Sequence, residues 1–319
     1  MRFKLVLLLI AAVALPLLSD SYVLYLANVT LSYVVVSAGL NILLGYSGQF
    51  AFANAAFMGL GAYTTAVLAT RWGVPVLLCI PVAAALTGVL GCVFSLPVMR
   101  LKNVYLAMVT LAFAELMQWI FIHWKTVTAG TDGLSIPVPH LFDWHLSDDR
   151  AAYVVVIAVV AIVMFLAERL MRSKIGRAFL AIKENEIVAQ CNGIDVARYK
   201  ALAFALSACM AGIGGSLFAL SVRYIIPDGF GLLQLVLQFS IVVIGGLGSL
   251  LGSTIGAIVL TLLPEILRDA AAIQEILYGV ILLVVVIFTP RGIAGLLYAR
   301  GLLRRKPLIA ANLRDEGQQ

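Results

Sequence analysis

Few side chains in the apolar part of the chain could take part in chemistry, and Glu115 is the most prominent of them. It lies at the centre of the mostly apolar run 111–118. A carboxylate at that depth in a bilayer costs roughly 2.5–3.5 kcal/mol, so we expect Glu115 to face the interior of a helix bundle. It could line a transport path there, or fix a neighbouring helix through a hydrogen bond. Asn41 is a similar case, with packing as the favoured role.

Two glycine-rich stretches interrupt apolar runs at membrane depth. The first is 45–50, followed by Asn54, and the second is 245–249. Irregular backbone within a bilayer persists only where protein or a water-filled cavity satisfies its polar groups. Transporters have such broken segments beside the transport path. Both stretches begin near the inner end of a predicted span, which suggests a duplicated architecture; two tight inner turns are the plainer alternative.

A polar segment at 171–199 has the composition of an extramembrane helix. Apolar residues recur within it at Ile187, Val188 and Cys191, and Gly193 stands where a C-terminal capping glycine would. The pattern predicts one short amphipathic helix. Such a helix could lie on the lipid headgroups or dock a cytoplasmic partner, and composition does not choose between them.

Motifs for ATP binding and hydrolysis are missing from this sequence. It has no G-x-x-x-x-G-K-[ST] stretch and no metalloprotease or serine-hydrolase motif at a plausible place. The four cysteines are scattered, so neither a disulfide framework nor a zinc site is expected. Active transport would then draw on an ion gradient or on ATP hydrolysed by another subunit.

The elements that must hold these residues are membrane-spanning helices. The chain has 319 residues, is 62% hydrophobic and only 12% charged, and has a mean hydropathy of +1.05. These values exclude a soluble enzyme, a disordered scaffold and a nucleic-acid binder. We predict an all-α polytopic membrane protein with about ten transmembrane helices. The predicted spans are 3–18, 22–44, 53–70, 75–98, 103–124, 151–170, 200–222, 230–247, 252–268 and 275–289.

Basic residues predict the orientation of these spans. With the N-terminus inside, 17 of the 22 Lys and Arg residues fall in inner segments. This is the positive-inside pattern, and it makes both termini cytoplasmic. It also accounts for the net charge of +6 without nucleic acid. We therefore expect one transmembrane domain over 1–319, with a cytoplasmic loop at 171–199, an outer loop at 125–150 and a basic C-terminal tail at 290–319.

The sequence resembles the LivM-type permease subunits of branched-chain amino acid ABC importers from about residue 31 to residue 296. The most specific match is the loop from Gly176-Arg177-Ala178 through Ala181-Ile182-Lys183-Glu184-Asn185-Glu186 to Gly193-Ile194, then Tyr199-Lys200. Further matches are Gly45-Tyr46-Ser47-Gly48-Gln49, Ala129-Gly130-Thr131-Asp132-Gly133-Leu134 and Gly245-Gly246-Leu247-Gly248-Ser249. The chain departs from the family pattern at Asn54, where many relatives have histidine.

The resemblance implies roles for the residues singled out above. The loop would couple the permease to its ATPase through Gly176, Arg177, Lys183, Glu184, Asn185, Glu186, Ala189 and Gly193. The translocation path would include Asn41, Gly45, Gln49, Asn54, Glu115, Gly245 and Gly246. The outer loop is too small to capture substrate alone, so Thr131, Asp132 and Gly133 at its start are expected to serve docking or gating.

The resemblance also implies an assembly in the bacterial cytoplasmic (inner) membrane. The chain would act with a second permease subunit of the LivH type, two ABC ATPase subunits and an external substrate-binding protein. It would need no cofactor or metal of its own, because ATP and Mg²⁺ would bind the ATPases. Leucine, isoleucine and valine are the expected substrates, with urea, amides or aromatic acids as alternatives. An ion-coupled secondary transporter is a further alternative, for which Glu115 is thin support.

Overall fold

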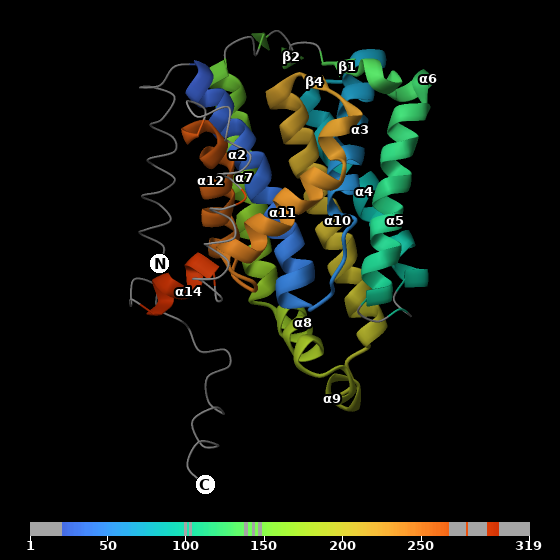
Figure 1. Cartoon of the computed structure of the whole chain (residues 1–319), viewed down its shortest axis with the longest axis vertical. Coiled ribbons are helices and arrows are strands. Elements are labelled where there is room, and N and C mark those ends of the chain that lie inside the picture. Colours follow the sequence, from blue (N-terminus) through green and yellow to red (C-terminus); the bar gives the residue numbers. More distant parts are fainter. Residues whose placement is uncertain are drawn as a thin grey trace.

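The computed structural model describes residues 21–98, 101, 104–136, 140–141, 144–145, 149–267, 279 and 292–299. Its long helices run roughly parallel as a bundle (Figure 1). They are α2 (Ser21–Asn41), α3 (Asn54–Arg71), α4 (Val76–Val98), α5 (Val104–His123), α7 (Asp149–Met171), α10 (Val196–Val222), α11 (Leu232–Gly245) and α12 (Leu250–Ile266).

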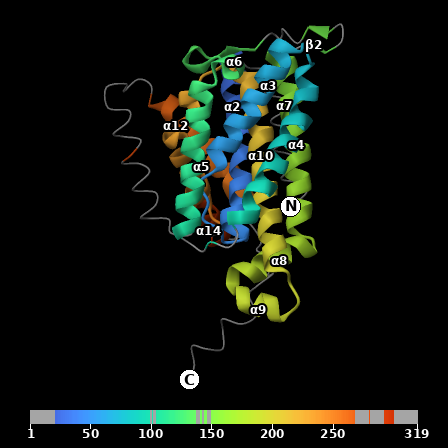
Figure 2. The same cartoon turned by 90° about the vertical axis from the view of Figure 1, so that its right-hand side faces the viewer.

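Shorter elements occupy the two ends of the bundle. One end carries α8 (Lys174–Glu184) and α9 (Glu186–Cys191), and the other carries α6 (Lys125–Thr128), β1 (Leu134–Ser135), β2 (His140–Leu141), β3 (Trp144–His145) and β4 (Tyr224–Ile225). The remaining short helices are η1 (Ile42–Tyr46), η2 (Gly130–Asp132), η3 (Pro227–Phe230) and α14 (Gly292–Ala299). Figures 1 and 2 both show α8 and α9 projecting at the end opposite to β2. The predicted inner and outer loops therefore lie at opposite ends of the molecule.

The described part of the chain confirms the prediction of about ten spans in part. Within the described residues, six helices are long and apolar enough to cross a membrane, and α12 is a shorter apolar helix. Helix α3 matches the predicted span 53–70 with each end shifted by one residue. Its sequence is too polar for it to count among the six apolar helices. The predicted spans 3–18 and 275–289 lie outside the described residues, apart from Gly279. The class of fold, an all-α polytopic membrane protein, is as predicted.

Small residues let α10 pack at the centre of the bundle. A Cβ atom on Gly61 of α3 would lie 2.2 Å from the Gly212 carbonyl oxygen of α10, and one on Gly215 would lie 2.0 Å from the Met58 carbonyl oxygen. Only glycine permits so close an approach of two helix backbones. Around this crossing, α10 also packs against α2 and α4 (Figure 1). This contact fixes the depth at which α3 begins.

The chain between α2 and α3 is not helical throughout. Helix α2 ends in the π-helical turn η1, and residues 47–53 then lead to the start of α3. In Figure 1 this blue segment turns back into the bundle beside α10. The Phe52 N–H donates to Thr110 Oγ1 at 2.9 Å, so part of the irregular backbone is satisfied by a side chain of α5.

Candidate functional site

The two glycine-rich breaks meet each other, and Asn41 joins them. Its Nδ2 donates to the Gly246 carbonyl at 3.2 Å, the Ser249 carbonyl at 2.9 Å and Ser253 Oγ at 2.6 Å. Its Oδ1 accepts from the Gly248 N–H at 2.8 Å. Asn41 is fully buried, so one amide side chain pairs with the Gly246 carbonyl and the Gly248 N–H of the irregular backbone, and it shares the Ser249 carbonyl with the Ser253 N–H.

Glycine is required where the breaks touch. A Cβ atom on Gly45 would lie 1.9 Å from Asn41 Oδ1 and 2.3 Å from the Gly248 nitrogen. Across the second break, a Cβ atom on Gly245 would lie 2.3 Å from the Gly252 carbonyl oxygen. Gly246 and Gly248 have φ angles of 118° and 79°, a region in which other residues are strained. The sequence thus permits a contact of backbone against backbone at this point.

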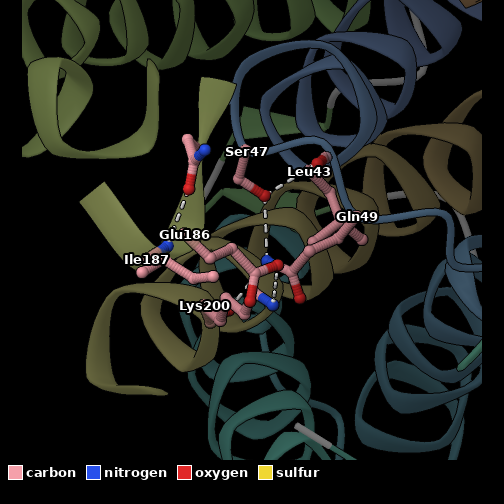
Figure 3. Close-up of polar contacts among 7 residues, drawn as sticks. Leu43, Ser47, Gln49, Glu186, Ile187 and Lys200 are labelled. Carbon is pink, nitrogen blue, oxygen red and sulfur yellow. Dashed lines mark hydrogen bonds and ion pairs between the residues drawn. The ribbon is translucent and has the colours of Figure 1, made fainter. Parts of the chain in front are cut away.

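The turn after Gly45 is held by its own side chains. Ser47 Oγ donates to the Leu43 carbonyl at 2.8 Å, and Gln49 Nε2 donates to Ser47 Oγ at 2.9 Å (Figure 3). Gln49 is buried and also donates to the Lys200 carbonyl at 3.2 Å, at the start of α10. The first break is therefore bonded to the helix that follows the predicted cytoplasmic loop.

The predicted cytoplasmic loop, 171–199, contains two helices, so the prediction of one helix is wrong. Asn185 ends α8, because its backbone is extended, and it begins α9 by accepting from the Ile187 N–H at 3.0 Å and the Val188 N–H at 3.2 Å. Asparagine is a strong N-terminal cap. Gly193 has φ of 79°, its N–H donates to the Gln190 carbonyl, and the Ile194 N–H donates to the Ala189 carbonyl. This is a Schellman motif, which confirms Gly193 as the capping glycine.

Lysine 183 connects this loop to the first break. Its Nζ donates to the Gly45 carbonyl at 2.7 Å. A Cβ atom on Gly48, whose φ is 73°, would lie 3.1 Å from Lys183 Cγ, so the lysine stem lies along the turn. Glu186 pairs with Lys200 at 2.5 Å and so ties α9 to α10 (Figure 3). A movement of α8 or α9 would therefore act directly on the glycine break.

The remaining loop residues divide into packed and exposed groups. Gly176 is buried, and a Cβ atom there would lie 2.0 Å from the Met171 carbonyl oxygen; Ala189 is also buried. Arg177 and Glu184 are exposed. Ile187 and Val188 are 72% and 56% exposed on α9, which is unusual for such apolar side chains outside the membrane. Exposed apolar residues on a projecting helix indicate a surface that another body covers.

Asn54 lies in a buried polar cluster between α3, α10 and α11. Its Nδ2 donates to Gln238 Oε1 at 2.9 Å, and its Oδ1 accepts from Ser207 Oγ at 3.3 Å. Gln238 is 1% exposed, and its Nε2 contacts Met58 Sδ at 3.2 Å. Gln238 and Ser207 were not identified as candidate site residues from the sequence. A glutamine within the apolar run 232–245 was the signal that could have found the first of them.

Glu115 does not face the interior of this chain, so that expectation is wrong. It lies on the exposed side of α5, together with Met108, Ala112 and Trp119. These positions recur every three or four residues and form one stripe. The stripe is separate from Asn41 and Asn54, which are both buried. A carboxylate within the membrane needs protein around it, but the sequence does not show which chain supplies that protein. The prediction assumed this chain, whereas a second subunit can cover Glu115.

The start of the outer loop is tied to the chain that follows α10. Strand β1 pairs antiparallel with β4, and Tyr224 Oη donates to the Asp132 carbonyl at 2.5 Å. Gly133 has φ of 70°, and a Cβ atom there would lie 2.6 Å from the Ile225 carbonyl oxygen. Thr131 and Asp132 are exposed. The predicted docking residues therefore sit on a braced turn at the end opposite to α8 and α9.

The polar side chains at the breaks and at Asn54 can form hydrogen bonds with a solute, but they offer little for covalent catalysis. The buried polar side chains at the breaks and at Asn54 are amides and hydroxyls, which exchange hydrogen bonds without changing charge. Within the part of the chain that the structure describes, no three His, Cys, Asp or Glu side chains are grouped to hold a metal ion. Neutral polar side chains beside irregular backbone are a feature that transporters have at their transport path.

Comparison with known proteins points the same way. Residues 22–290 match the family model described as branched-chain amino acid transport system / permease component. The chain is 31% identical to the high-affinity branched-chain amino acid transport system permease protein LivM of Escherichia coli, over 92% of this chain and 74% of that protein. It is 24% identical to a probable LivM of Methanocaldococcus jannaschii, over 76% and 73%. It is also 29% identical to LivH of E. coli, over 54% and 59%. No solved structure matches.

Proposed function

The chain belongs to the branched-chain amino acid transport system permease family, and from that premise we propose that it is the permease subunit of an ATP-driven importer of leucine, isoleucine and valine. It is a multi-pass membrane transport protein and not an enzyme. The proposed translocation path forms between this chain and a second, LivH-like permease. The likeness of the chain to LivH supports such a partner, since two related subunits can form a closed assembly.

The observation that carries this proposal is the hydrogen bond from Lys183 to the Gly45 carbonyl. In the proposed mechanism, two ATPase subunits bind ATP and Mg²⁺, and their closure moves α8 and α9. The exposed Ile187 and Val188 supply the apolar contact with the ATPase. Lys183 and the Glu186–Lys200 pair then transmit the displacement to the first glycine break and to α10.

The proposed path runs beside the two breaks. Asn41, Gly45, Gln49, Gly245 and Gly246 form the inner part of its wall. Because Gly45 contacts the second break through Gly248 and Asn41, a displacement of the first break reaches both. In the proposed mechanism this contact alternates between closed and separated arrangements, as alternating access requires.

Further out, the proposed path includes Asn54 and Glu115. Asn54 and its partner Gln238 offer amide donors and acceptors to a polar solute. The exposure of Glu115 supports a position facing the second permease, because a carboxylate at mid-depth facing lipid would be costly. The proposed outer contact, with a substrate-binding protein, is made by the turn at Thr131, Asp132 and Gly133.

Reconstitution of the complete transporter tests this function. The chain would be incorporated into proteoliposomes with a second permease subunit, the ATPase pair and the binding protein. We expect uptake of radiolabelled leucine that requires ATP and binding protein, and that excess isoleucine or valine inhibits. Parallel competition with urea, short amides and aromatic acids tests the alternative substrate classes.

Two results would contradict the proposal. Strong competition by urea, an amide or an aromatic acid, without competition by isoleucine or valine, would move the substrate to another class. Uptake by this chain alone, driven by a sodium or proton gradient, would make it a secondary transporter. A proteoliposome that lacks only the ATPase pair is the matched control, and we expect it to be inactive.

A further inference from the structure

An apolar cavity of about 270 Å³ lies between α3, α4 and α5, at the end of the bundle opposite to α8. Its walls include Val67 and Leu68 of α3, Leu86 of α4, and Met117 and Ile120 of α5. It is separate from the glycine breaks and from the Asn54 cluster, because none of their residues lines it. Figure 2 looks at the side of the molecule on which α4 and α5 lie.

The cavity arises because α4 and α5 diverge. Toward the α8 end, they touch through Phe94 and Phe113, whose ring centroids are 4.2 Å apart. Toward the opposite end, the cavity lies between them over α3, and Leu86 is 43% exposed at its rim. The space is a narrow slot that opens toward the side of the bundle. Within a membrane, that side faces lipid or another subunit.

The cavity wall offers no hydrogen bonds from its threonines. Thr64 Oγ1 donates to the Leu60 carbonyl at 2.6 Å, and Thr128 Oγ1 donates to the Phe121 carbonyl at 2.7 Å. Both hydroxyl hydrogens are therefore donated within the protein. The rest of the lining is aliphatic or aromatic, and the buried hydroxyl of Tyr63 is a further polar atom beside it. A water molecule in a cavity needs two to four polar partners, and apart from the Tyr63 hydroxyl this wall is almost entirely apolar. The wall suits a hydrocarbon chain.

Residues at the mouth fix its depth in the membrane. Trp72 and Trp124 both line the cavity and are 75% and 54% exposed. Trp124 directly follows α5, whose 20 residues extend about 30 Å, the thickness of a bilayer core. Exposed tryptophans at such a position mark the membrane–water interface. The mouth of the slot thus lies at the level of the lipid headgroups.

Basic side chains stand beside both tryptophans. The Arg71 guanidinium donates to the Thr126 carbonyl and, at 3.2 Å, to the Val127 carbonyl, so it is held against the short helix that borders the cavity. Lys125 follows Trp124 and is exposed. An arginine fork and a lysine at headgroup level are the groups that bind a lipid phosphate. Their charge is complementary to an anionic phospholipid.

We propose that this cavity is a binding site for one phospholipid of the outer leaflet. One acyl chain occupies the slot between α3, α4 and α5, and the anionic headgroup lies at Arg71 and Lys125. The volume is below the roughly 300–1,000 Å³ of pockets that enclose a whole ligand, which fits part of a single chain. The lipid fills the divergence between α4 and α5 and so supports the wall formed by α5.

Native mass spectrometry of the complete transporter tests this site with added phosphatidylglycerol and, in parallel, phosphatidylcholine. The filling variant is Val67→Trp, and the matched control is Val154→Trp, at a 54% exposed position near the corresponding end of α7. We expect one phosphatidylglycerol to be retained per copy of this chain in the native and control proteins and to be lost in Val67→Trp. A third variant, Lys125→Glu, lies at an exposed position and should lower phosphatidylglycerol retention about fivefold or more with little effect on phosphatidylcholine.

Three results would overturn the proposal. Equal lipid retention in Val67→Trp and Val154→Trp would remove the cavity as the binding site. Equal retention of phosphatidylglycerol and phosphatidylcholine, unchanged in Lys125→Glu, would contradict the proposed binding of the headgroup at Arg71 and Lys125. Loss of the second permease subunit from the Val67→Trp complex, with no lipid retained in the native one, would assign the slot to a subunit interface.

Discussion

At the scale of single residues, Lys183 links the predicted cytoplasmic loop to the first glycine break. We expect Lys183→Met to keep the lysine stem against Gly48 but to remove the donor to the Gly45 carbonyl. A hydrogen bond from a charged group contributes about 1.5–3 kcal/mol, so we expect uptake to fall roughly tenfold or more while ATP hydrolysis continues.

The control for this variant is Lys174→Met, at the start of the same helix, where no hydrogen bond to the lysine is seen among the described residues. Leucine uptake and phosphate release, measured on the same proteoliposomes, give the amount of leucine imported per ATP hydrolysed. An unchanged ratio in Lys183→Met would refute the role of this contact in coupling.

Glu115 supports a prediction about charge in the path. Glu115→Gln keeps the size and hydrogen-bonding capacity of the side chain, so we expect the complex to assemble normally and uptake to drop. Because Glu115 is exposed on this chain, Glu115→Ala should leave the melting temperature of the isolated chain unchanged. Normal uptake with glutamine, together with loss of the second permease in Glu115→Ala, would instead make Glu115 a contact that holds the subunits together.

At the scale of secondary-structure elements, Asn41 joins α2 to α12 and to the second break. Asn41→Leu would leave the Gly246 carbonyl and the Gly248 N–H without this partner, whereas the Ser249 carbonyl keeps the Ser253 N–H. Unpaired buried groups cost about 1–3 kcal/mol each, so we expect clear destabilisation in a thermal melt. Asn28→Leu in the same helix is the control, because Asn28 Oδ1 is buried and unpaired among the described residues. Equal melting temperatures for the two variants would contradict the role of Asn41.

Helix α9 gives a second prediction at this scale. Gly193→Pro removes the N–H that caps α9 and is incompatible with φ of 79°, so we expect ATP hydrolysis without uptake. Gly193→Asn should remain active, because asparagine tolerates the left-handed region and no atom lies within 4 Å of a Cβ there. Glu186→Ala, which breaks the pair with Lys200, should uncouple in the same direction. Full uptake in Gly193→Pro and Glu186→Ala would refute the coupling role of α9.

The elements show what local sequence can and cannot predict. The glycine breaks were found because they interrupt an apolar pattern, and Gly193 because a glycine after a short helix has a specific backbone use. The meeting of the breaks at Asn41 was not predicted, since it joins residues 205 positions apart, and pairing at that range leaves no local pattern. The division of α8 from α9 was missed although Asn185 was a readable capping signal.

At the scale of the whole molecule, the proposed orientation rests on the positive-inside pattern and can be measured through Cys191. This cysteine is exposed on α9, whereas Cys79 is buried and Cys92 lies within the membrane-spanning α4. We expect a membrane-impermeant maleimide to label Cys191 in inside-out vesicles and not in intact cells. Thr131→Cys in a Cys191→Ser background should show the opposite result. Labelling of Cys191 in intact cells would show that the orientation is the opposite of the one proposed.

The overall class of the molecule was predictable because composition alone demands a bilayer as solvent. The exposed position of Glu115 was not predictable. Hydropathy measures the preference of a residue for lipid or water and carries no information about contacts with a second protein. The polarity of α3 has a related cause, because the neighbours of this helix are protein and not lipid. Helix α3 is buried among its neighbours along most of its length, so it tolerates polar residues and need not be as apolar as a helix that contacts lipid.

The bond between Asn41 and the second break also bears on how the chain is made. Ribosomes synthesise about 5–20 residues per second, so Asn41 emerges roughly 10–40 s before Gly246, its partner 205 residues later. During that interval the amide of Asn41 and the open turn after Gly45 must be hydrated or shielded by the insertion machinery. The part of the protein that precedes α11 therefore lacks the partner of Asn41 until α11 and α12 are made. A chain truncated before α11 should be recognised as incomplete and degraded.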